Sequence, residues 1–148
     1  MPGCGGANRY GESAAYEHKI RADVFGDRGD KEAALAELKL SVEADPKDFL
    51  LRTEYATLLM ETGDIEGAQK QIFEALNNEP SAPLIWITQA NLYIKQGATK
   101  KAEAAAIKGM QVDQDDIEAP LWLADFYKNK GDTMRLQQMH QVIVERSR

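Results

Sequence analysis

The sequence of 148 residues contains a single cysteine, Cys4, and only two histidines, His18 and His140. One cysteine cannot form an intrachain disulfide, and it excludes a metal cluster built on several thiolates. The two histidines lie near opposite ends of the chain, so neither falls in the tight His/Glu spacing of a metalloprotease. The sequence therefore predicts no metal site and no cofactor.

Long apolar runs and an excess of basic residues are also missing. The longest apolar stretch of the repeat body is the segment PLIWI, which is too short to cross a membrane. The formal net charge is −6 and the isoelectric point is near 5.0, whereas phosphate binding needs clustered lysine and arginine. We therefore expect no transmembrane segment and no nucleic-acid partner.

Catalytic groups are equally scarce. The sequence contains no recognisable nucleophile–base pair and no glycine-rich phosphate loop. The acidic segment VDQDDIEAP could offer oxygen ligands to calcium, but it lacks the mid-loop glycine and the closing glutamate of a calcium-binding loop. The acidic segment is better interpreted as carboxylates placed at the N-terminus of a helix, where the helix dipole favours negative charge. The chain is expected to have no catalytic residues and not to be an enzyme.

The sequence does contain a period of 34 residues. Glycine recurs at this step, and two alanine columns, a column of bulky apolar residues and a pair of prolines keep the same step, as expected of a repeat protein. The members are Gly29, Gly63, Gly97 and Gly131; Ala22, Ala56, Ala90 and Ala124; Ala34, Ala68 and Ala102; Phe25, Leu59, Tyr93 and Tyr127; and Pro46 and Pro80.

Each unit predicts two amphipathic helices joined by a tight turn. In the second unit, Leu51, Tyr55 and Leu58 follow helical spacing before Gly63, and DIEGAQKQIFEAL continues with a second helical pattern. Glycine adopts a positive φ without a Cβ clash, and an aspartate after it can accept backbone N–H bonds from the next helix. The tripeptide Arg28-Gly29-Asp30 is therefore interpreted as such a turn and not as a cell-adhesion ligand.

These landmarks resemble the tetratricopeptide repeat family, whose 34-residue units are helix-turn-helix hairpins. The third unit matches best, through Trp86, Ala90, Tyr93, Gly97 and Ala102. The resemblance implies an all-α fold, a right-handed superhelical stack of four units. The units are expected at about 15–48, 49–82, 83–116 and 117–148, within a repeat domain of residues 14–148 that follows a flexible, Gly-rich tail of residues 1–13.

The resemblance also implies that the first helix of each unit lines a concave groove, which binds a peptide or an amphipathic helix of a partner protein. The alternative is that the apolar groove residues only pack against neighbouring units. The partner-binding residues expected from the family's groove positions are Leu50, Thr53, Thr57, Leu84, Ile87, Asn91, Ile94, Leu121 and Asp125.

One subclass of the family clamps the C-terminal carboxylate of heat-shock chaperones with lysine, arginine and asparagine side chains. Lys19 matches one clamp position, but Asp23, Glu54, Leu84 and Thr88 stand where the other clamp residues are needed. Because aspartate and glutamate repel a carboxylate, the chain is not expected to bind that chaperone terminus.

The N-terminal segment MPGCGGANRYGES is Gly-rich, polar and without apolar periodicity. Its PGCGG sequence resembles the end of a bacterial lipoprotein signal, in which the cysteine is lipidated, but without the apolar stretch that precedes such a cysteine. With a lipid on Cys4, the chain would resemble small repeat lipoproteins of the periplasm-facing cell envelope that help assemble pili or exported polymers. The alternatives are a cytoplasmic adaptor and a structural protein that self-associates through Leu136, Met139 and Ile143.

Overall fold

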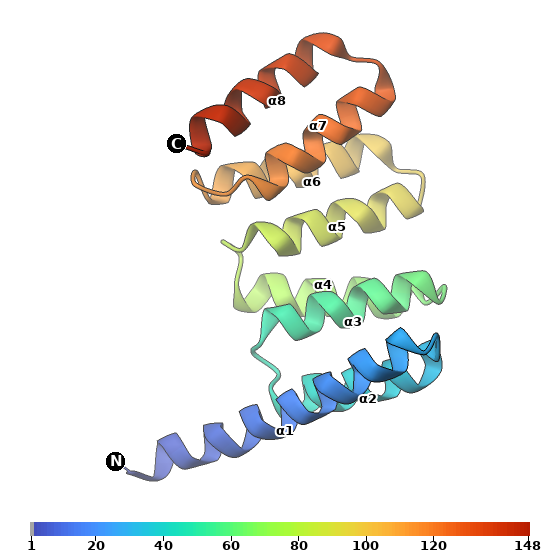
Figure 1. The fold of residues 1–148 in the computed structure, drawn as a ribbon, viewed down its shortest axis with the longest axis vertical. Coiled ribbons are helices and arrows are strands. Elements are labelled where there is room, and N and C mark those ends of the chain that lie inside the picture. Colours follow the sequence, from blue (N-terminus) through green and yellow to red (C-terminus); the bar gives the residue numbers. More distant parts are fainter. Residues whose placement is uncertain (1) are drawn as a thin grey trace. The chain divides into compact units, whose positions relative to one another are not determined.

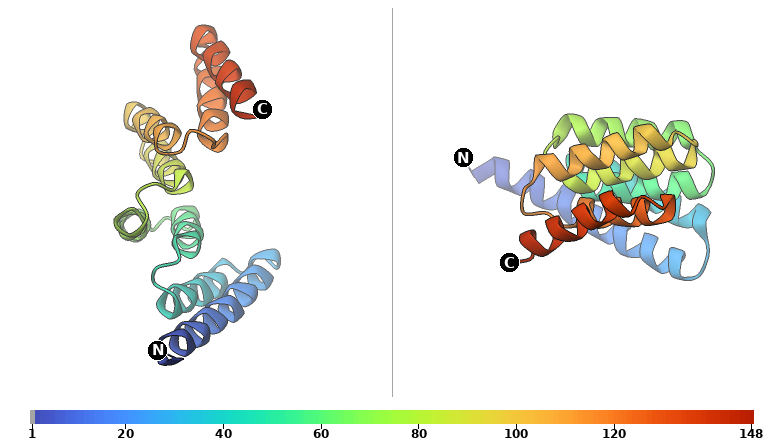
Figure 2. Two further views of the ribbon diagram at one scale, coloured as in Figure 1. Left: turned by 90° about the vertical axis from the view of Figure 1, so that its left-hand side faces the viewer. Right: turned by 90° about the horizontal axis from the view of Figure 1, so that it is seen from above.

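The computed structural model describes the backbone of residues 2–148 and the side chains of residues 11–148, and over these residues it contains eight α-helices and no strand (Figure 1). The helices are α1 Pro2–Asp27, α2 Lys31–Ala44, α3 Phe49–Glu61, α4 Ile65–Asn78, α5 Pro83–Lys95, α6 Thr99–Val112, α7 Glu118–Lys130 and α8 Thr133–Arg146. They pair as hairpins, α1 with α2, α3 with α4, α5 with α6 and α7 with α8 (Figure 2). The predicted all-α repeat fold is confirmed.

Each hairpin turns at a glycine with a left-handed backbone. The four glycines of the 34-residue column have φ between 76° and 93°, a conformation that strains any residue with a Cβ atom. The residue after each glycine donates its N–H to the carbonyl of the bulky apolar column, as Asp64 does to Leu59 at 2.8 Å. The glycine period therefore marks where the first helix of each hairpin ends, and Arg28-Gly29-Asp30 is a turn.

The second helix of three hairpins starts at an aspartate cap. The side chains of Asp30, Asp64 and Asp132 accept a hydrogen bond from the backbone N–H three residues later, at 3.0, 2.9 and 3.1 Å. Such a cap satisfies an N–H group that has no partner inside the helix. The third hairpin has Ala98 at this place, and its side chain makes no capping bond.

The two alanine columns lie in the interior of the hairpins. All seven alanines are buried, with at most 8% of the residue exposed. Because an alanine lets two helix backbones approach closely, the larger side chains of the next layer can fill the space beside it. The last hairpin departs from the pattern, since half-buried Leu136 takes the place of the second alanine.

The contacts divide the chain into two compact units, residues 1–78 with helices α1–α4 and residues 79–148 with helices α5–α8. In the first unit, Val42 of α2 and Leu51 of α3 pack with Ala15 of α1 in a buried cluster. The one buried hydroxyl beside it is satisfied, because Ser41 donates to the Ala15 carbonyl oxygen at 2.6 Å. This polar contact ties α1 to α2.

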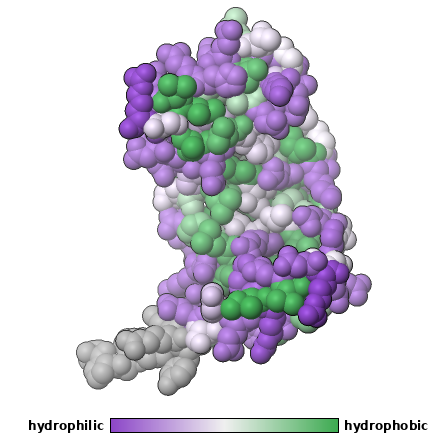
Figure 3. All heavy atoms as spheres, in the orientation of Figure 1, coloured by the Kyte–Doolittle hydropathy of each residue, from purple (hydrophilic) through white to green (hydrophobic). Residues whose placement is uncertain are grey.

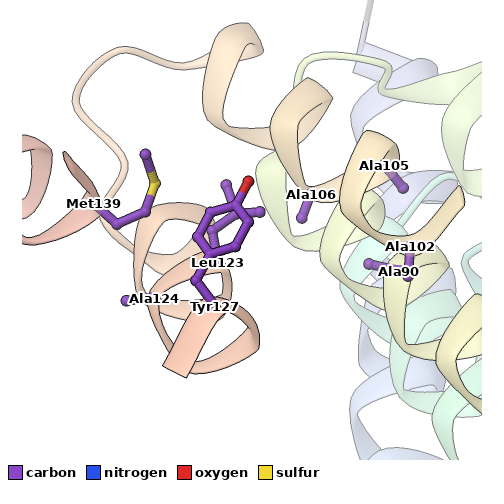
Figure 4. Close-up of a cluster of buried hydrophobic side chains, with 8 residues drawn as sticks. All are labelled: Ala90, Ala102, Ala105, Ala106, Leu123, Ala124, Tyr127 and Met139. Carbon is purple, nitrogen blue, oxygen red and sulfur yellow. The ribbon is translucent and has the colours of Figure 1, made fainter. Parts of the chain in front are cut away.

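The core of the second unit is built from large side chains set against small ones. Leu123 and Tyr127 of α7 and Met139 of α8 belong to the same buried cluster as the alanines of α5 and α6, which Figure 4 shows together. The alanine layer thus gives the bulky residues of the last hairpin a flat surface to pack on.

Helix α1 begins at Pro2 and so includes most of residues 1–13, for which flexibility stays a prediction. Gly11 lies against the end of α2, where a Cβ atom would come within 2.8 Å of the Ala44 carbonyl oxygen. Gly11 therefore belongs to the packing of the first hairpin, which the Gly-rich composition conceals. The side chain of Cys4 lies outside the described residues, and its lipidation stays a prediction.

The C-terminal helix is held by Arg146. Its guanidinium group donates to the carbonyl oxygens of Met110, Asp113 and Asp116 at 3.0, 3.0 and 2.8 Å. These carbonyls lie at the end of α6 and in the loop that leads to α7, where the helix itself supplies no partner. One side chain near the end of α8 thus ties that helix to the α6–α7 connection.

Candidate functional site

In the second unit, six of the nine predicted partner-binding residues lie on α5 and α7. They are Leu84, Ile87, Asn91 and Ile94 on α5, and Leu121 and Asp125 on α7. Ile94 is 42% and Leu121 48% exposed, and the polar Asn91 and Asp125 are exposed as well. Figure 3 shows hydrophobic side chains, in green, over the region of α7. These two helices therefore combine accessible apolar and polar groups.

A side-chain hydrogen bond joins α5 to α7. The indole Nε1 of Trp122 donates to Oδ1 of Asn91 at 2.8 Å. Trp122 also stacks on Phe126, with ring centroids 5.4 Å apart, so its ring is fixed from two directions. Because the bond uses the oxygen of Asn91, the amide nitrogen stays available to donate to a bound backbone.

Two of the predicted binding residues are buried. Ile87 of α5 is 9% exposed and Thr53 of α3 is 3% exposed, and the Thr53 hydroxyl donates to the Leu50 carbonyl oxygen at 2.8 Å. These side chains offer a partner little surface. The other two residues predicted on α3 are accessible, since Leu50 is 50% exposed and Thr57 is exposed with its hydroxyl bonded to the Thr53 carbonyl oxygen.

The first unit contains a hollow of about 540 Å³ lined by residues of α1, α2 and α3. Its apolar lining includes buried Leu38 and half-buried Leu58, and Thr57 is the one predicted binding residue that lines it. The charged side chains of the lining are four carboxylates, Asp23 and Asp27 of α1 and Glu54 and Glu61 of α3. A volume of several hundred cubic ångströms is in the range of small ligand sites.

One ammonium group is already held between the two carboxylate-bearing helices. Lys19 of α1 bonds both oxygens of Asp23, at 2.6 and 2.7 Å, and lies 3.0 Å from Oε2 of Glu54 on α3. Burial alone lowers the pKa of Lys19, but the hydrogen bonds to Asp23 and Glu54 outweigh it and raise the pKa above the usual lysine value. At the other end, Lys31 approaches Glu61 only to 3.8 Å.

Sequence reasoning did not predict this hollow, although a signal for it exists. Asp23 and Asp27 are four residues apart on one helix, and Glu54 and Glu61 are seven apart on another, so each pair shares a helix face. In the sequence, Asp23 and Glu54 stand out as mismatches to a chaperone clamp, and the pattern assigns no role to Asp27 and Glu61. Their position relative to each other follows from how α1, α2 and α3 pack.

A second hollow of about 540 Å³ is lined by residues of α2, α3 and α4 in the same unit. Here three basic side chains, Lys39, Arg52 and Lys70, accompany the two carboxylates of Glu43 and Glu74. Unlike the α1–α3 hollow, it has no excess of carboxylates.

The residues considered for self-association serve the interior of the last hairpin. Met139 is 8% exposed, and Leu136 and Ile143 are half-buried against the same cluster. On α8 the accessible large apolar side chains are instead Met134, 71% exposed, and Val144, 55% exposed. Self-association through the three predicted residues would thus compete with their own packing.

Within residues 11–148, whose side chains are described, no three or more histidine, cysteine, aspartate or glutamate side chains are grouped so as to hold a metal ion. In the part of the chain that the structure describes, no helix has the length and apolar character needed to cross a membrane.

One family model matches part of the chain. A family model described as tetratricopeptide repeat matches residues 27–92, from the end of α1 into α5. No curated protein matches the sequence.

Solved structures share the helical arrangement at low sequence identity. That of pilF from Pseudomonas aeruginosa is 17% identical with a TM-score of 0.73, and the similarity covers 90% of this chain but only 61% of pilF. A tetratricopeptide repeat protein from Parabacteroides merdae is 23% identical, with a TM-score of 0.68 and coverage of 90% and 53%. The first tetratricopeptide repeat domain of Spaghetti (RPAP3), bound to the HSP90 peptide SRMEEVD, is 14% identical, with a TM-score of 0.64 and coverage of 90% and 95%. At these identities the likeness establishes the fold.

Proposed function

We propose that the chain, which has the fold of tetratricopeptide repeat proteins and matches their family model over residues 27–92, is a non-enzymatic scaffold that binds a peptide or an amphipathic helix of a partner protein on the first helices of its repeats. Repeats of this family generally act as protein-interaction scaffolds, which supports the class of function. Beyond this general function, we propose which residues bind the partner and which class of peptide they bind.

The observation that carries the proposal is the pairing of apolar and hydrogen-bonding groups on α5 and α7. Ile94 and Leu121 keep nearly half of their surface accessible, and Asn91 keeps a free amide donor beside the fixed ring of Trp122. An amphipathic segment needs both kinds of contact, because apolar anchors supply affinity and amide groups bond its backbone. Ile87 and Thr53 are buried, so the proposal assigns them no direct contact with the ligand.

The structural neighbour that holds an HSP90 peptide supports a peptide as the ligand. The acidic peptide itself is not expected to bind here, because Asp23 and Glu54 lie near Lys19 and already neutralise its ammonium group. The ligand we propose is a segment with apolar anchors and without an acidic C-terminus.

Selection from short random peptides displayed on phage, with the intact chain immobilised, tests the proposal. Selected peptides should bind wild type and lose about tenfold in affinity on Ile94→Asp/Leu121→Asp, because each exposed carboxylate disrupts an apolar contact. The matched control is Met134→Asp/Val144→Asp, which adds the same charges at exposed apolar positions of α8. Equal affinity for both double variants, or a selection that yields no peptide, would refute the proposal.

In its finer form, the proposal places the scaffold in the bacterial cell envelope, anchored by a lipid on Cys4 and engaged in pilus or export assembly. The PGCGG sequence supports the anchor, and the fold shared with pilF from Pseudomonas aeruginosa is compatible with it. Intact-mass spectrometry of the natively expressed protein should show a lipid adduct that Cys4→Ser removes. An unmodified mass in the membrane fraction would exclude the anchor and leave the peptide-binding proposal intact.

A further inference from the structure

The α1–α3 hollow of the first unit carries more negative charge than its own lysines neutralise. Four carboxylates line it, and two ammonium groups approach them, those of Lys19 and Lys31, so four negative and two positive charges leave an excess of two negative charges. Figure 3 shows hydrophilic side chains, in purple, around this region, with a green stripe along α1. An acidic ligand is therefore repelled, and a basic one is attracted.

The carboxylates are arranged as two pairs along the same two helices. Asp23 and Glu54, one from each helix, hold the ammonium group of Lys19 at 2.6–3.0 Å, which shows that a cation fits between α1 and α3. The second pair follows in the same direction, since Asp27 lies four residues after Asp23 and Glu61 lies seven residues after Glu54. Helix geometry places both on the face of the first pair.

No lysine among the described side chains is held between Asp27 and Glu61 as Lys19 is held between Asp23 and Glu54. Asp27 forms no ion pair within the described side chains, and Lys31 reaches Glu61 at 3.8 Å with more than half of both side chains exposed. Such a contact contributes little, because exposed ion pairs are screened by water and salt. In the apolar lining next to it, half-buried Leu58 suits the methylene stem of a long basic side chain.

We propose that the α1–α3 hollow takes a lysine or arginine side chain of a basic peptide, with its stem on Leu58 and its cation between Asp27 and Glu61. The inference rests on the proposed function, because it concerns a peptide that the scaffold binds. It adds a cationic class of peptide, bound by the first unit.

Fluorescence anisotropy with two labelled peptides tests this inference. One probe is a short peptide that alternates arginine and leucine, and the other has glutamine in place of each arginine. The variants are Asp27→Asn/Glu61→Gln and, as a matched control, Glu43→Gln/Glu74→Gln, which removes two charges from the other hollow of the same unit. All four substitutions keep side-chain size.

The arginine peptide should bind wild type and the control alike and bind Asp27→Asn/Glu61→Gln about fivefold more weakly, as expected for the loss of two partly exposed ionic contacts. The glutamine peptide should not distinguish the variants. Equal weakening by both double variants would mean that only overall charge matters, and equal affinity for all three proteins, or no binding of the arginine peptide, would also overturn the inference. Any of these results leaves the proposed function standing if the phage-selected peptides still depend on Ile94 and Leu121.

Discussion

The two units carry different chemistry at the same repeat positions. By the 34-residue step, Asp27 and Glu61 of the first unit correspond to Lys95 and Asn129 of the second. The glycine column is common to both units and the alanine columns nearly so, with Leu136 as the exception, because a left-handed turn favours glycine and a close helix approach favours alanine. The framework is thus shared, and the exposed positions are free to differ.

The difference extends to the residues that face the neighbouring hairpin. Glu54 of α3 corresponds to Trp122 of α7, so one unit has a carboxylate that bonds Lys19 where the other has an indole that bonds Asn91. Each residue links the first helices of two successive hairpins, one by charge and one by a neutral hydrogen bond. One backbone arrangement therefore supports a cation-binding hollow in the first unit and an apolar face in the second.

Truncation of the core should have the largest effect, and it tests whether the units unfold separately. Leu123 of α7 is fully buried, so Leu123→Ala should leave a cavity and lower the free energy of unfolding of the second unit by about 3 kcal/mol. Because the contacts cluster within each unit, native-state hydrogen exchange should quicken in α5–α8 and stay unchanged in α1–α4.

The reciprocal variant is Ile72→Ala in α4, whose side chain is also fully buried. It should quicken exchange in α1–α4 alone. If either variant quickens exchange equally over all eight helices, the chain unfolds as one cooperative block and the comparison of two independent units fails.

A smaller effect is expected from alkaline titration of the second unit. Burial, followed by a hydrogen bond to Glu103, raises the pKa of Tyr127 from 10.0 to about 12, and the hydroxyl donates to Oε1 of Glu103 at 2.8 Å. Since the folded pKa lies above the unfolded one, the stabilisation is complete below about pH 10 and is lost as pH rises towards 12. The free energy of unfolding of the second unit should fall by about 2 kcal/mol over this pH range.

Urea unfolding followed by tryptophan fluorescence measures this loss, because both tryptophans, Trp86 and Trp122, lie in the second unit. Tyr127→Phe should abolish the dependence between about pH 10 and 12. Tyr55→Phe, which removes a tyrosine hydroxyl from the first unit, is the control and should preserve it. An unchanged slope in Tyr127→Phe would mean that another group governs alkaline stability.

The repeat period made the fold predictable, because each column of the period reports one backbone requirement. Gly63 needs a positive φ and Ala56 permits a close helix contact, and both requirements recur in every unit. A contact that occurs only once produces no residue that recurs at the 34-residue step, so the sequence pattern does not predict it. Gly11 against Ala44, and Arg146 on the carbonyls of the α6–α7 loop, have no counterpart 34 residues away and appear only in the folded chain.

The candidate site was predictable in part for a related reason. Of the residues expected from the family's groove positions, Leu121 and Ile94 are exposed and Ile87 and Thr53 are buried, because a position within a repeat does not show which neighbouring side chain covers it. The acidic hollow depends on three helices meeting, which no pattern within a single helix encodes.

The smallest expected effect concerns the one hairpin of the four without an aspartate cap. The backbone of Ala98 has φ −89° and ψ 68°, close to the −84° and 84° of Asp132, so an aspartate side chain fits at Ala98 without a change of backbone. Ala98→Asp should stabilise the second unit by about 1 kcal/mol, because it satisfies an N–H group of α6 and offsets the charges of Lys100 and Lys101 in the first turn.

The matched variant Asp132→Ala removes the aspartate cap of α8 in the same unit. Urea unfolding followed by tryptophan fluorescence gives the free energy of unfolding of both variants. We expect changes of similar size and opposite sign, since each variant makes or removes one side-chain bond to a backbone N–H. A loss in Asp132→Ala without a gain in Ala98→Asp would mean that the first turn of α6 is already satisfied by water. In that case an aspartate cap would stabilise only the hairpins that have one and would not be a general requirement of the repeat. The features shared by all hairpins would then be limited to the glycine and alanine columns.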